Sequence, residues 1–168
     1  MEQIRETFLE WLRDAHAAEK QALTMLNSQA NRIEGYPALR GRIEQHIRET
    51  ESQVEALEGL LDRYGTSSST IKDMTGRAMA LAQSLGGAVS TDEVVKGSLF
   101  SYAFEQMEIA SYTILIATAE LLDDQEAVTV LNGILRQEQD MALWLLDNMD
   151  GVTREYLARL GQDVAAKR

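Results

Sequence analysis

The sequence predicts an all-α protein, a four-helix bundle with one long crossover. Its 168 residues correspond to one domain, since domains usually hold about 100–200 residues. It contains a single proline, and alanine, leucine and glutamate are abundant, a composition typical of helices. Apolar residues recur at helical spacing along four long segments, and we find no strand pattern. We therefore expect one bundle domain over residues 1–160, followed by a frayed tail over 161–168.

The first two long helices are predicted in the first 65 residues. One extends from about 2 to 33, and it ends before Pro37 because proline disfavours helix in the residue that precedes it. The next extends from about 38 to 64 and stops at Gly65. Only a few residues separate these two segments.

A much longer connection follows, of about 26 residues, and it contains a polar loop and a short helix expected over about 70–85. A connection of that length can cross the whole bundle. One long crossover between two closely connected helix pairs is the ferritin-like arrangement.

The remaining helices lie after this connection. Residues 90–93 have the pattern of a capping box, which opens a third long helix over about 91–122. The fourth is expected from just after Asp124 to about 149, where Asp150-Gly151 stops it. A short C-terminal helix over about 152–160 completes the prediction.

Charge and cysteine content exclude several classes of function. Lys and Arg number 16 against 27 Asp and Glu, a formal net charge of −11, which disfavours binding to nucleic-acid phosphates or anionic lipid. The absence of cysteine excludes disulfides, iron–sulfur clusters and thiol catalysis. The N-terminus lacks a signal-peptide pattern, and the longest stretch without a charge, 109–119, has 11 residues, too few to span a bilayer. We expect a cytoplasmic protein without nucleic-acid or membrane partners.

Each long helix carries a carboxylate on or near its apolar stripe, close to the helix midpoint. In an antiparallel bundle the midpoints share one level, so these side chains should converge. The second helix is the least regular, because His46 lies on the stripe and Glu49 about 60° to one side. The candidate metal ligands are Glu19, His46, Glu49, Glu105, Glu108 and Glu138.

The negative charge of such a cluster needs compensation, because burying an unpaired carboxylate costs several kcal/mol. No lysine or arginine lies on the stripes at this level. Arg42 lies near the stripe of the second helix, but two turns from Glu49. Protonation or bound cations remain, and oxygen-rich sites with an imidazole suit iron or manganese, with zinc also admitted.

The segments WLRDAHAAEKQA, YPALRGRIEQHIRETESQV and VKGSLFSYAFEQMEIASYT resemble the YciE/YciF family of bacterial stress proteins, with the closer likeness to YciE. The likeness extends to about residue 149. That family belongs to the ferritin-like superfamily and resembles rubrerythrin in its bundle and inferred dinuclear metal centre. The resemblance implies a homodimer. It also implies metal-ligand roles for Glu19, Glu49, Glu105, Glu108 and Glu138.

The sequence departs from rubrerythrin-like sites, which carry Glu-x-x-His on the second and fourth helices. Here the third positions are Ser52 and Met141, and His46 precedes its glutamate. Oxygen-rich ligation and a single occupied metal position therefore both stay open. We expect a centre for up to two iron ions that oxidises ferrous iron with dioxygen or peroxide, without assigning catalytic residues. The alternative is a non-catalytic structural or interaction protein of the stress response with a degenerate metal site.

Overall fold

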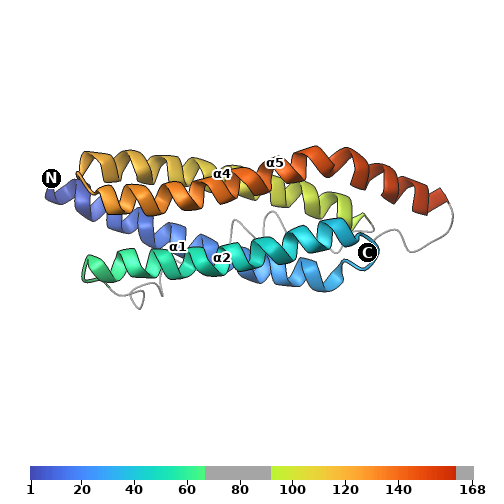
Figure 1. Ribbon diagram of the computed structural model, residues 1–168, viewed down its shortest axis with the longest axis horizontal. Coiled ribbons are helices and arrows are strands. Elements are labelled where there is room, and N and C mark those ends of the chain that lie inside the picture. Colours follow the sequence, from blue (N-terminus) through green and yellow to red (C-terminus); the bar gives the residue numbers. More distant parts are fainter. Residues whose placement is uncertain (67–91, 162–168) are drawn as a thin grey trace.

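The computed structural model describes residues 1–66 and 92–161, and within them it contains four long helices and no strand (Figure 1). The helices are α1 (Glu2–Arg32), α2 (Pro37–Arg63), α4 (Glu93–Leu121) and α5 (Gln125–Gly161). This confirms the all-α prediction. The short helix expected over 70–85, the first two residues of the predicted capping box and the tail from 162 lie outside the described residues.

The helices form two antiparallel pairs, α1 with α2 and α4 with α5 (Figure 1). In the bundle α1 also lies beside α4, and α2 beside α5. Helices α2 and α4 run in the same direction, so α2 ends and α4 begins at opposite ends of the bundle (Figure 1). This is the topology of a bundle with one long crossover.

Proline and glycine define the ends of α2. Pro37 occupies the first turn, where its missing N–H would have had no partner within the helix. Past the last turn, Gly65 has a φ of 70°, in the left-handed region that favours glycine. Its N–H donates to the carbonyl of Asp62 at 2.8 Å, and so helps to satisfy the free carbonyls at the helix end.

Helix α5 does not stop at Asp150-Gly151 but continues to Gly161. The prediction of a helix end there and of a separate short helix over 152–160 is wrong. A glycine inside a helix costs only about 1 kcal/mol. Val152 and Tyr156 pack against the core beyond that point, and this contact outweighs the cost.

The interior consists of two apolar layers separated by a polar one. Layer A, near the start of α1, is built around Phe8, Leu57 and Leu131. Layer B, near the end of α1, is built around Leu26 and Leu145. The polar layer lies between them, near the middle of α1, α2 and α4 and in the first half of α5. None of the described helices contains an apolar stretch of the length that a membrane span requires.

Candidate metal centre

The polar layer holds five of the six predicted ligands, and each of these side chains is at most 2% exposed. They come from all four helices, which supports the expectation that stripe carboxylates at one level converge. These residues are Glu19 on α1, His46 on α2, Glu105 and Glu108 on α4, and Glu138 on α5.

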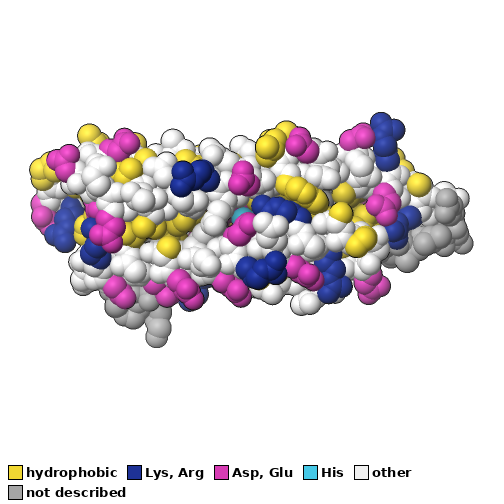
Figure 2. Space-filling model, viewed as in Figure 1, with side chains coloured by type: hydrophobic (Ala, Val, Ile, Leu, Met, Phe, Trp, Pro, Cys, Tyr) yellow, Lys and Arg dark blue, Asp and Glu magenta, His cyan; other side chains and the backbone are white. Residues whose placement is uncertain are grey.

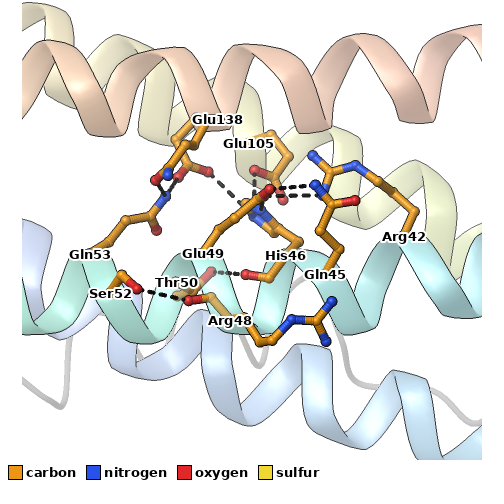
Figure 3. A network of polar contacts seen from close by, with 11 residues as sticks. Arg42, Gln45, His46, Arg48, Glu49, Thr50, Ser52, Gln53, Glu105 and Glu138 are labelled. Atoms are coloured by element: carbon orange, nitrogen blue, oxygen red, sulfur yellow. Dashed lines mark hydrogen bonds and ion pairs between the residues drawn. The ribbon is translucent and has the colours of Figure 1, made fainter.

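His46 is the centre of this arrangement (Figure 3). Its Nε2 atom lies 3.3 Å from Oε2 of Glu105 and 3.5 Å from Oε2 of Glu138. One potential ligand atom from each of these three residues lies within 4.8 Å of the others. Three donors from α2, α4 and α5 therefore face a common point.

Several carboxylate oxygens in the polar layer make no hydrogen bond. Two of them, Oε2 of Glu105 and Oε2 of Glu138, face only Nε2 of His46, at ion-pair distance. The other two are Oε2 of Glu19 and Oε1 of Glu108. The fully buried polar residues of the described chain include no lysine or arginine. Because buried oxygens without partners are costly, and because carboxylates with one imidazole are donors that iron and manganese accept, these residues fit a metal centre.

Burial and mutual repulsion change how the glutamates titrate. Burial, followed by the charge of Glu138, raises the pKa of Glu19 well above its usual value, although Glu19 accepts a hydrogen bond from the hydroxyl of Tyr112. Burial and the neighbouring charge of Glu19 likewise raise the pKa of Glu108. Burial also raises the pKa of Glu105, to about 8. In the metal-free site these glutamates therefore stay protonated to a higher pH than exposed glutamates do.

For His46, contacts with neighbouring carboxylates have a larger effect on the pKa than burial has. Burial alone would lower its pKa, but close contacts with the carboxylates of Glu105, Glu138 and Glu49 outweigh burial and raise the pKa of His46 to about 12. The pKa of Glu138 is lowered, because its contacts with His46 outweigh the effect of burial. In the metal-free protein His46 is thus the cation that balances Glu138. Metal binding would have to displace its proton.

Glu49 lies at the outer edge of this site and outside the three-residue cluster. Its side chain is 19% exposed, and its Oε2 atom lies 2.9 Å from Nδ1 of His46. Arg42 donates to the same oxygen at 3.1 Å, and Gln45 donates to Oε1 at 2.7 Å. Arg42 thus reaches across the two turns that separate it from Glu49. These bonds outweigh the effect of burial and lower the pKa of Glu49 to about 2.

Gln53 is a site residue that the sequence analysis missed. It is buried, and its Nε2 donates to Glu138 and, at 2.9 Å, to Oε1 of Gln137. Its own Oε1 atom is buried without a partner. A signal was available, because Gln53 lies seven residues after His46 and so on the same stripe. Ser52, the position compared with a ligand histidine, is exposed.

The second histidine does not join the cluster. His16 is buried on α1, and its Nε2 atom lies 2.9 Å from Oε1 of Glu58. Met141 is also buried and packs within layer B. Among the described residues, His46 is therefore the one histidine that faces the candidate site, which agrees with the noted departure from two-histidine sites.

A family model described as "Domain of unknown function (DUF892)" matches residues 3–158. The chain belongs to this family. Protein YciF of Escherichia coli (strain K12) is 28% identical over 155 residues, 88% of this chain and 90% of that protein. The crystal structure of the E. coli stress protein YciF matches with a TM-score of 0.70 and 23% identity, over 89% of this chain and 96% of that one. The resemblance to the YciE/YciF family is confirmed, and the closer likeness to YciE stays a prediction.

Two further solved structures share the fold. A protein from Xanthomonas campestris pv. campestris has a TM-score of 0.80 and 37% identity, over 95% of this DUF892 chain and 99% of that one. A structure of ferritin-like, diiron-carboxylate proteins from Bacillus anthracis has a TM-score of 0.72 and 19% identity, over 89% and 99% of the chains. The ferritin-like bundle is therefore confirmed.

Proposed function

We propose that this chain is a ferritin-like stress-response protein that binds iron in the polar layer and oxidises ferrous iron with dioxygen or peroxide. The observation that carries the proposal is the convergence of His46, Glu105 and Glu138 within 4.8 Å, next to buried oxygens without partners. The descriptions of the E. coli relative as a stress protein and of the Bacillus structure as diiron-carboxylate support it.

The described residues offer ligands for two ions. His46, Glu105 and Glu138 would hold the first, while Glu19 and Glu108 add oxygens for a second. Glu49 contacts the outer nitrogen of His46, a position from which a carboxylate fixes the orientation of a metal-binding imidazole. Gln53 holds Glu138 through its Nε2 donor. Manganese and zinc accept the same donor types, so metal content has to be measured.

Ferrous iron is the substrate in this proposal. Two ferrous ions each give one electron to hydrogen peroxide, its O–O bond breaks, and two protons complete two water molecules. With dioxygen, the same two electrons and two protons give hydrogen peroxide. The chain's contribution is to hold the two ions near each other with anionic oxygens, which favour the more highly charged ferric product.

Elemental analysis of protein purified without chelator, and again after anaerobic loading with ferrous iron, tests the proposal. We expect about one to two metal ions per chain, the number that carboxylate sites in helical bundles hold. Mixing the loaded protein with peroxide or dioxygen should then produce ferric absorbance faster than protein-free iron does.

A matched pair of variants on α4 provides the control. Glu105→Gln should lower both the metal content and the oxidation rate, whereas Glu120→Gln makes the same change at an exposed position and should alter neither. Wild-type protein that binds no stoichiometric metal would overturn the proposal and favour the non-catalytic structural or interaction protein.

A further inference from the structure

The inner cluster is closed to solvent, so an incoming cation has to cross a layer of side chains. Glu19, His46, Glu105, Glu108 and Glu138 are each at most 2% exposed. Glu49, at 19%, is the one predicted ligand with substantial exposed surface. Its carboxylate faces solvent on one side and His46 on the other.

Glu49 lies along the seam between α2 and α5, which have the sparsest contacts of any two neighbouring helices in the described bundle. Figure 2 shows a trace of histidine at this seam, between acidic and basic side chains. The close-up places Glu49 and His46 between the two helices (Figure 3). Glu49 therefore lies between solvent and His46 at this seam.

The imidazole of His46 connects the outer and inner carboxylates. Its Nδ1 atom is 2.9 Å from Glu49, and its Nε2 atom is 3.3 Å from Glu105. A cation held by Glu49 would thus be one ring width from the inner donors.

Arg42 occupies this outer position in the metal-free protein. Its guanidinium donates to Oε2 of Glu49, the oxygen that also faces His46. Arg42 is thus a single positive charge at the place where a divalent cation would first meet a carboxylate. A divalent ion can replace it, because doubling the charge doubles the Coulomb attraction at a given distance.

We propose that Glu49 is the entry ligand for divalent cations bound for the inner cluster, and that Arg42 is a latch that cation arrival displaces. This proposal rests on the proposed function, in which the inner cluster binds metal. It adds the route by which the cation enters and the residue, Arg42, that blocks this route. In this assignment Glu49 holds the ion in transit, and the inner donors hold it at equilibrium.

Stopped-flow uptake of cobalt(II), followed by its visible absorbance without oxidant, tests the latch. Glu49→Gln should slow uptake and Arg42→Gln should accelerate it, each about thirtyfold, the factor for one unit charge acting on a divalent ion at about 4 Å in water. At saturating cobalt(II), Arg42→Gln should reach the wild-type stoichiometry. Glu49→Gln should fill the same number of inner sites but with a weaker Kd, because Glu49 also orients His46. Arg42→Met, which keeps the aliphatic stem, replaces Arg42→Gln if thermal melts show that the latter does not fold.

The exposed pair Arg40–Glu44, 2.8 Å apart on the same helix, provides matched controls. Arg40→Gln and Glu44→Gln change the net charge equally and should leave uptake unchanged. Equal changes in uptake rate in the control and test pairs would show that only the net charge matters, and would overturn the latch. Unchanged rates in both test variants, or loss of one bound ion in Glu49→Gln, would also overturn it. Wild-type protein that takes up no cobalt would instead contradict the metal site itself.

Discussion

Leu131 and Glu138 lie two turns apart on α5, and both side chains are 0% exposed. Leu131 packs within layer A among apolar neighbours. Glu138 lies in the polar layer, where one oxygen accepts a hydrogen bond from Gln53 and the other makes no hydrogen bond but faces Nε2 of His46 at 3.5 Å. The same helix therefore buries one residue that stabilises the fold unaided and another whose environment is incomplete.

The two kinds of layer contribute to stability in opposite directions. Burying a leucine side chain is worth about 1.5–3 kcal/mol. Burying a carboxylate costs free energy unless it is protonated or paired. The polar layer meets this cost in the metal-free protein by protonating several glutamates and by charging His46. A bundle selected for stability alone would carry apolar residues there, so the polar layer indicates a ligand.

The largest expected effect is in the apolar layer. Leu131→Ala should lower the free energy of unfolding by about 2–5 kcal/mol, because it leaves a cavity among fully buried neighbours. Metal stoichiometry should not change, since the site is two turns away. Chemical denaturation with elemental analysis measures both. A metal content that falls together with stability in the folded variant would show that the layers are not independent.

A smaller effect of opposite sign is expected in the polar layer. Glu108 is fully buried with an oxygen that lacks a partner, so Glu108→Leu should leave the unfolding free energy in chelator unchanged or raise it by about 1–4 kcal/mol. With metal at a hundredfold excess over its Kd, wild type should gain about 2.7 kcal/mol, and the variant less.

Glu120→Leu, at an exposed position on the same helix, is the control and should alter neither quantity by more than about 0.5 kcal/mol. A Glu108→Leu protein that melts well below wild type in chelator would mean that the carboxylate is a structural partner and that the contrast between the layers is wrong.

The pH dependence of the metal-free protein should also reflect the polar layer. The folded pKa is raised from 4.5 to about 8 for Glu105 and from 6.5 to about 12 for His46. The native state therefore binds more protons than the unfolded state across this window, so stability should fall by about 1–3 kcal/mol between about pH 5 and pH 7.

Glu49 acts in the opposite sense, because its folded pKa is lowered to about 2. Its contribution is present above 4.5 and is lost as the pH falls toward 2. Maximal stability of the metal-free protein should thus lie at mildly acidic pH, and metal should flatten the decline toward neutrality. Thermal melts of metal-depleted protein test this, and a melting temperature that rises steadily from acid to neutral pH would refute it.

The smallest effect concerns the part of α5 that supports layer B. A Cβ added at Gly151 would meet no atom within 4 Å, so Gly151→Ala should stabilise the continuous helix by about 0.5–1 kcal/mol. A melting temperature that stays the same or falls would indicate that the helix does not continue through this position.

Most of the fold followed from patterns along the chain. Apolar periodicity located the four long helices, and Pro37 and Gly65 located two of their ends within one or two residues. The carboxylates on the stripes predicted the polar layer, because the direction of a Cβ atom around a helix depends on sequence position alone.

The partners of each side chain could not be obtained in this way. Glu49 lies about 60° from the stripe, from where its flexible side chain can turn inward or outward, and only the position of Arg42 and Gln45 decides between them. Gln53 was overlooked although it lies on the same stripe as His46. Only the structure shows that its amide donates a hydrogen bond to Glu138.

The sequence by itself determined that four helices meet with acidic residues at one level, because helical periodicity and the cost of burying charge are local properties. The tertiary structure alone decided that α5 continues past Gly151, since packing of Tyr156 outweighs a local penalty of about 1 kcal/mol. It also decided that His46 stands between an outer carboxylate and two inner ones. That arrangement depends on distances between helices, and these cannot be obtained from the residue spacing within one helix.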